Sequence, residues 1–145
     1  MKKFILILCL CLITTNVFCE TETIDGRWWN ELNTKFGEDY GRLTKLDFVK
    51  GFSRGYISSL YYVWKNLKKQ NMTKGADAVF KMENYPYDYN FGEIIDFIDK
   101  FYSNPQYKIL KVDKVLIEII FPALNKAWSQ EQIDKKAVEI LKESK

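Results

Sequence analysis

The 145-residue chain contains no histidine, and its three cysteines, Cys9, Cys11 and Cys19, all lie near its start. Histidine is the commonest general base near neutral pH and the commonest metal ligand in proteins. Cysteine supplies thiol nucleophiles and zinc ligands. A folded part without either residue is expected to bind no metal, to need no cofactor and to have no catalytic residues. The composition therefore predicts a binding protein and not an enzyme.

Carboxylates are the remaining candidates for chemistry. Glu93, Asp96 and Asp99 are close together in one segment. Glu93 is better explained as a helix cap, and the two aspartates fall opposite the apolar side of the expected helix, where solvated residues usually lie. A carboxylate-based hydrolase is therefore the weaker alternative.

The charge balance argues against nucleic-acid binding. Without Lys2 and Lys3, 20 basic residues stand against 19 acidic ones, and the two signs are interspersed without a basic stripe. Nucleic-acid-binding proteins usually carry a clustered excess of positive charge. We therefore expect a protein partner, and a homodimer stays open as well.

The first 19 residues are typical of a secretory signal peptide. A basic start precedes an apolar run over 4–13 that is too short to span a bilayer as an anchor. Val17 and Cys19 are small enough for the cleavage site of a signal peptidase. We expect a periplasmic or secreted protein with no membrane span, in which residues 20–145 form a single helical domain without a disulfide.

A cleavage one residue earlier is the alternative. It would leave Cys19 as the lipid-bearing first residue of a structural or surface protein, although Phe18 is bulkier than such signals prefer. The 126 residues that follow position 19 suffice for one domain with a single core.

The segment 43–71 has the clearest helical pattern. Thr44 is a suitable N-cap residue, and Asp47 follows in the first turn, where a negative charge is favourable. Apolar residues recur at three- and four-residue intervals and predict one buried face. That face comprises Val49, Phe52, Tyr56, Leu60, Trp64 and Leu67.

Small residues form a second line on this helix. Gly51, Gly55 and Ser59 recur at four-residue intervals. A glycine in a helix interior costs roughly 1 kcal/mol relative to alanine. We therefore expect another helix to pack closely against this line. The alternative is that two glycines are tolerated on an exposed face.

Capping signals place two further helices. Asn90 and Glu93 form a capping box that opens a helix ending near Pro105, because the residue before a proline disfavours the helical region. Ser129 and Gln132 form a second capping box, which opens the last helix.

Three other segments are less regular. An opening helix is expected over 25–36, and a third helix over 114–127 with Asp113 as its cap. Pro122 should kink or restart that helix, since its ring clashes with the carbonyl four residues back. Residues 71–90 are expected to be a long connection with a single helical turn.

No segment alternates convincingly with a period of two residues. The nearest candidate strand, KILKV at 108–112, is isolated. The chain is therefore expected to be all-α, a compact bundle of four to five helices.

The stretch NYPYDYNFGE, 84–93, gathers four aromatic rings where the chain should turn. The rings either cover the end of the core or meet a partner, for which tyrosine is well suited. The preferred form of the second hypothesis places Phe91 inside and the tyrosines after Pro86 outside. The candidate partner-binding residues are Tyr85, Tyr87, Asp88 and Tyr89.

Three segments resemble the Rap/Tai-type periplasmic immunity proteins, which protect bacteria from peptidoglycan amidases delivered by type VI secretion. They are FVKGFSRGY at 48–56, FGEIIDFIDKFYSNP at 91–105 and VLIEIIFPALNKAW at 115–128. The similarity spans roughly residues 25–128. It implies a helical inhibitor that occludes the active site of a secreted cell-wall amidase.

Overall fold

The computed structural model describes residues 23–81 and 85–143, and the expected signal peptide lies outside them. The described residues form an all-α fold without strands, which confirms the predicted fold class. They include no cysteine, so no disulfide links them. The helices in chain order are α2 Gly26–Phe36, α3 Glu38–Lys69, α4 Thr73–Lys81, α5 Phe91–Tyr102, a 3-10 turn Pro105–Tyr107, α6 Val112–Val115, a π-helix Leu116–Ile120, α7 Phe121–Lys126 and α8 Gln130–Glu143.

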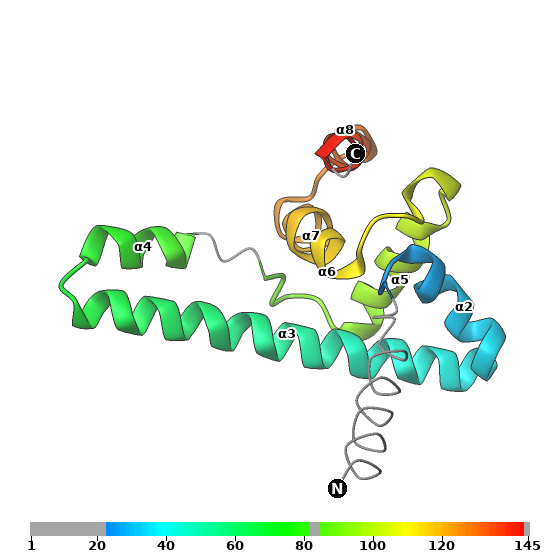
Figure 1. The fold of residues 1–145 in the computed structure, drawn as a ribbon, viewed down its shortest axis with the longest axis horizontal. Coiled ribbons are helices and arrows are strands. Elements are labelled where there is room, and N and C mark those ends of the chain that lie inside the picture. The colour runs from blue at the N-terminus through cyan, green and yellow to red at the C-terminus, as the bar shows by residue number, and fades with distance from the viewer. Residues whose placement is uncertain (1–22, 82–84, 144–145) are drawn as a thin grey trace, which may run out of the picture.

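The long helix α3 runs along one side of the molecule (Figure 1). Its first half packs against α2 and α5, and its end pairs with α4 in a helical hairpin that projects from the body. We call this hairpin, residues 61–69 of α3 together with α4, the arm. On the other side of the body, α8 packs against the π-helix.

The core lies between α3, α5 and the segment from α6 to α7. Trp29 of α2, Tyr102 of α5 and Phe121 of α7 are its largest fully buried side chains. The aliphatic part comes mainly from α5 and the π-helix. Burial of these apolar surfaces is the main stabilising contribution available to a domain of this size without a disulfide. The buried aliphatic side chains include Ile94, Ile95, Ile98, Leu116, Ile119 and Ile120.

Helix starts agree with the capping predictions at two of four places. Both capping boxes are present, at Asn90 and at Ser129. The Thr44 cap is wrong, because α3 already begins at Glu38 and the Thr44 hydroxyl donates to the carbonyl of Tyr40 within the helix. The Asp113 cap is also wrong, because Lys111 occupies the N-cap position of α6.

Pro122 interrupts its helix, as its covalent structure predicts. The π-helix directly precedes α7, and Pro122 lies in the first turn of α7. A proline has no N–H and its ring would clash with the carbonyl of Glu118 in a regular helix. The wider π turn removes that clash. The buried faces on both sides of the interruption still point into one core.

The expected close packing on the line Gly51, Gly55 and Ser59 is wrong for the described part of the chain. An ideal Cβ placed on Gly51 or Gly55 meets no atom within 4 Å, and Ser59 is exposed. The line lies on the outer face of α3 because the apolar face that contains Val49 turns toward the body.

The segment 108–112 is not a strand, but its backbone holds the beginning of the described chain. The Gly26 N–H donates to the carbonyl of Leu110 at 3.2 Å, and the Val112 N–H donates to the carbonyl of Ile24 at 2.9 Å. Asp25 and Lys111 form an isolated antiparallel bridge. These bonds attach the start of α2 to a segment more than 80 residues later, near the beginning of α6.

Candidate binding surface

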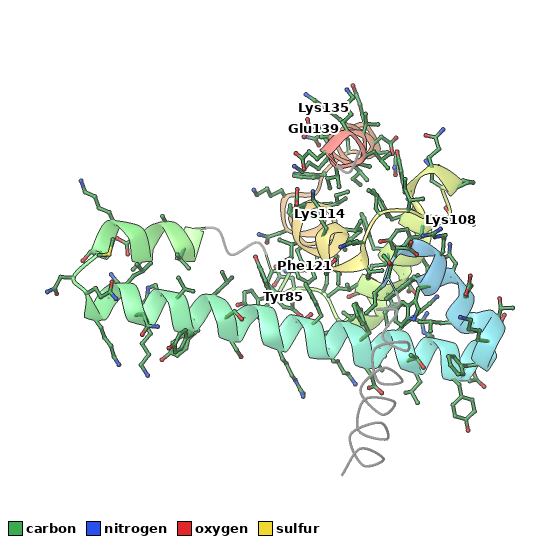
Figure 2. The ribbon with its side chains drawn as sticks, viewed as in Figure 1. Tyr85, Lys108, Lys114, Phe121, Lys135 and Glu139 are labelled. Atoms are coloured by element: carbon green, nitrogen blue, oxygen red, sulfur yellow. The ribbon has the colours of Figure 1, made fainter. Side chains whose placement is uncertain are left out.

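Tyr85 fixes the loop 85–89 to the core. Its ring is 8% exposed and packs edge-on against Phe121, with the ring centroids 5.1 Å apart. Figure 2 shows these two residues side by side between α3 and α7. The inclusion of Tyr85 among the partner-contacting residues is therefore wrong. Its side chain is an anchor, and its burial leaves little surface for a second protein.

The other candidate residues of the loop face solvent. Tyr87 is 64% exposed, Tyr89 is 38% exposed, and Asp88 between them is exposed as well. The Tyr87 ring contacts the Tyr85 ring at 5.0 Å, so one of the exposed rings rests on the anchor. Phe91, the next aromatic residue, is partly buried against the core. The sequence pattern had suggested this inside–outside division.

Backbone and capping bonds hold the loop in one shape. The Tyr89 N–H donates to the carbonyl of Pro86 at 3.1 Å, which closes a turn. The Asn90 side chain accepts from the Glu93 N–H, and the Glu93 carboxylate accepts from the Asn90 N–H. The loop thus leaves a buried anchor and ends at a capped helix. A loop held at both ends loses less conformational entropy on binding than a free one.

An open groove of about 450 Å³ lies between α3 and the C-terminal part of the chain. Tyr56 and Leu60 of α3 form one wall, and the other walls are apolar with charged residues at intervals. Tyr56 also contacts the ring of Phe121 at 5.9 Å, so the groove wall and the loop anchor share one buried ring. The other lining residues are Ile117, Glu118, Pro122, Lys126, Trp128 and Lys136.

The sequence pattern did not identify this groove, because its walls come from three distant parts of the chain. Tyr56 and Leu60 were assigned to the apolar face of the helix that was expected to be buried, yet both are only partly buried. The signal that could have indicated them is the length of α3. A 32-residue helix is about 48 Å long, longer than a small domain can cover, so part of its apolar face must stay open.

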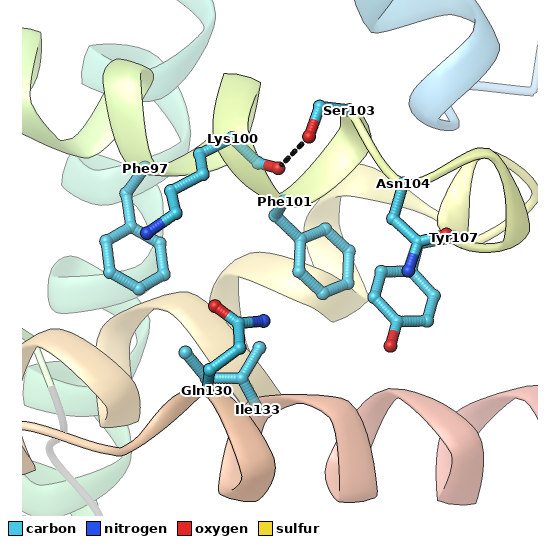
Figure 3. A pocket seen from close by; sticks show the side chains of 8 residues that line it. All are labelled: Phe97, Lys100, Phe101, Ser103, Asn104, Tyr107, Gln130 and Ile133. Carbon is cyan, nitrogen blue, oxygen red and sulfur yellow. Dashed lines mark hydrogen bonds between the residues drawn. The ribbon is translucent and has the colours of Figure 1, made fainter.

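A smaller cavity of about 220 Å³ lies between α5, the 3-10 turn and α8 (Figure 3). Phe101 and Tyr107 stack in its wall with their centroids 4.8 Å apart. Burial, together with the hydrogen bond from its hydroxyl to Asp134, raises the pKa of Tyr107 to about 12. The cavity is below the size of typical ligand pockets, about 300–1,000 Å³. We therefore assign it no ligand.

The carboxylates of α5 have structural partners. Asp96 pairs with Arg42 at 2.8 Å, Asp99 pairs with Lys45 at 2.7 Å, and Glu93 caps the helix. Within residues 23–81 and 85–143, no three histidine, cysteine or acidic side chains are grouped as a metal site would require. In the same residues, no helix combines the length and the apolar composition of a membrane span.

The chain matches no protein-family model, no curated protein sequence and no solved structure.

Proposed function

We propose that this protein is an exported helical binding protein that inhibits a cell-wall amidase by occluding the active site of that enzyme. The observation that carries the proposal is the loop 85–89, which is anchored by Tyr85 and presents Tyr87, Asp88 and Tyr89 to solvent. The resemblance of three segments to immunity proteins supplies the partner class.

The composition of the loop suits insertion into a cleft. Tyrosine offers a large contact area with few rotatable bonds and a hydroxyl that can donate or accept a hydrogen bond. Asp88, between the two exposed tyrosines, can pair with a basic side chain at the rim of a cleft. The groove beside the anchor would receive an apolar segment of the same partner.

Binding without turnover is part of the proposal. The chain has no histidine, and its cysteines all lie within the first 19 residues. The acidic side chains of α5 are engaged in ion pairs or in the helix cap. We expect the purified protein to leave peptidoglycan intact.

The direct test uses the amidase encoded beside the gene for this protein, because a toxin and its immunity protein are needed together. Release of soluble peptides from purified peptidoglycan is measured with the amidase alone and with the mature protein added. We expect stoichiometric inhibition. The double variant Tyr87→Ala/Tyr89→Ala should weaken the inhibition about 100-fold or more, since exposed tyrosines often act as binding hot spots.

Phe36→Ala is the matched control, because Phe36 is an exposed aromatic residue of α2, outside the loop 85–89. It should inhibit as the unmodified protein does. Loss of the circular dichroism signal in the double variant would show that the tyrosines stabilise the fold. Inhibition that survives the double variant would exclude this loop as the contact.

Export is tested separately by mass spectrometry of the protein purified from its own host. A chain that begins at Glu20 agrees with the proposal. A lipid-bearing Cys19 would support the surface-anchored alternative and place the protein on a membrane.

A further inference from the structure

The outer face of α3 carries a row of exposed residues that no other described element covers. Two large rings stand at its ends, because Tyr40 is 71% exposed and Tyr62 is 66% exposed. Positions three, four or seven residues apart share one face of a helix. The exposed residues on this face are Tyr40, Leu43, Asp47, Gly51, Arg54, Gly55, Ser58, Tyr61 and Tyr62.

This face is nearly symmetrical about Gly51. Tyr40 precedes Gly51 by 11 residues and Tyr62 follows it by 11 residues. At a rise of about 1.5 Å per residue, each ring lies about 16 Å along the helix axis from the glycine. If two such helices cross antiparallel at Gly51, Tyr40 of each copy therefore lies opposite Tyr62 of the other copy.

The charges on the face are complementary in the same arrangement. Asp47 precedes Gly51 by four residues and Arg54 follows it by three. In an antiparallel crossing at Gly51, Asp47 of one copy and Arg54 of the other lie at nearly the same height. Their positions along the helix axis differ by about 2 Å. Neither residue makes an ion pair within residues 23–81 and 85–143. Each is therefore available to a second copy.

The glycines have no function within one copy that the structure shows. A Cβ on Gly51 or Gly55 would meet open space, so the fold of a single chain does not require glycine there. Each glycine nevertheless destabilises an isolated helix relative to alanine. At a crossing point, by contrast, the absence of a side chain lets two backbones approach closely.

We propose that two copies of this protein form a symmetric dimer in which the outer faces of α3 pack antiparallel and cross at Gly51. The crossing is of the shallow type, about 20°, because only a small angle keeps the rings near one another at both ends. The interface is isologous, so each contact occurs twice. It lies on the opposite side of α3 from the body, and a dimer therefore leaves the core packing of each copy unchanged (Figure 1).

One helix face is a small interface compared with the roughly 800 Å² per partner of a standard protein complex. We therefore expect a dimer that dissociates in the micromolar range. Sedimentation equilibrium of the mature protein across concentrations from about 1 μM to 1 mM should show a monomer that converts to a dimer.

Gly51→Leu is the sharpest variant, because its side chain meets open space in one copy and the second backbone in the dimer. It should keep the circular dichroism spectrum and weaken dimerisation at least tenfold. Lys142→Glu, an exposed charge change on α8, is the matched control and should dimerise as the unmodified protein does.

Charge exchange tests the orientation. Asp47→Arg and Arg54→Asp should each weaken the dimer roughly tenfold, and the double variant should recover most of the loss, because the two charges meet only across an antiparallel pair. A protein that stays monomeric at 1 mM overturns the proposal. So does a dimer that is unaffected by Gly51→Leu, which would place the interface elsewhere.

Discussion

At the scale of single residues, Lys45 is the least expected side chain of the core. It is 2% exposed, and its ammonium group lies 2.7 Å from Asp99 Oδ1 and over the ring of Trp29. The indole N–H of Trp29 donates to the same carboxylate oxygen at 2.6 Å. One partly exposed carboxylate thus compensates a buried cation and orients a buried ring.

Replacing the two partners should therefore have unequal effects. Asp99→Asn leaves the ammonium of Lys45 buried without a counter-charge and should lower the free energy of unfolding by about 3 kcal/mol, the lower end for such pairs because Asp99 partly faces water. Lys45→Met removes the buried charge itself and should cost less. Urea titration of both variants and of the double variant measures the difference. Equal losses would contradict this account.

Asp25 is the N-cap residue of α2, and the ionisation of its carboxyl makes the stability of the fold depend on pH. Burial alone would raise the pKa of its carboxyl, but hydrogen bonds from the Arg27 side chain and from the Trp28 and Arg27 N–H groups outweigh burial and hold the pKa below the ordinary 3.8. A lowered pKa means that the carboxylate stabilises the fold above pH 3.8. That contribution is lost as the pH falls through the lowered value.

Asp25→Asn keeps a capping oxygen and removes the charge. It should cost about 1 kcal/mol at neutral pH, and the difference from the unmodified protein should shrink as the pH falls below about 4. Urea titrations at a series of pH values between 2 and 7 measure this. A difference that stays constant over this range would show that the charge of Asp25 contributes nothing.

At the scale of elements, the helix features that depend on residues close together in the sequence could be predicted. A helix that depends on packing against another helix could not. The capping box at Asn90 and the interruption at Pro122 need only residues within a few positions of each other. By contrast, α4 spans nine residues where a single turn was expected, and it packs against α3 with Ala76 fully buried. No sequence pattern within 73–81 indicates that this segment packs against α3.

Two glycines show the same difference between a position that packs against a distant segment and a position that does not. A Cβ on Gly26 would overlap the ring of Tyr102 and lie 2.9 Å from the Lys108 Cα, whereas a Cβ on Gly55 meets nothing. Gly26→Ala should destabilise the protein by about 1–3 kcal/mol through overpacking. Gly55→Ala should stabilise the monomer by up to about 1 kcal/mol. Thermal unfolding of dilute samples measures both, and changes of the same sign would be the contrary result.

At the scale of the whole molecule, the arm and the body should differ in stability. Val49 in the first half of α3 is fully buried, whereas residues 61–69, in the half of α3 that pairs with α4, are at most partly buried. Local opening requires less free energy where fewer apolar contacts are broken. Amide hydrogen exchange should therefore be faster in the arm than near Val49. Equal protection along all of α3 would show that the helix opens as one unit.

The candidate surface could be predicted only in part at this scale. The composition of 84–93 indicated a special loop, and the exposure of Tyr87 and Tyr89 agrees with the division proposed for it. The burial of Tyr85 depends on Phe121, which is 36 residues further along the chain. No local pattern contains that contact. The groove beside it has the same origin, since its walls meet only in the folded chain.

The bonds between residues 24–27 and 108–112 have a consequence for biosynthesis. A ribosome releases the beginning of α2 long before it releases the carbonyls of Lys108 and Leu110 that accept its N–H groups. Until about three quarters of the polypeptide has emerged, the backbone N–H groups at the start of α2 lack these acceptors, although α2 can already pack against α3. The packing of α2 on α3 needs only the residues up to Lys69, whereas the attachment of 24–27 to 108–112 is completed late in synthesis.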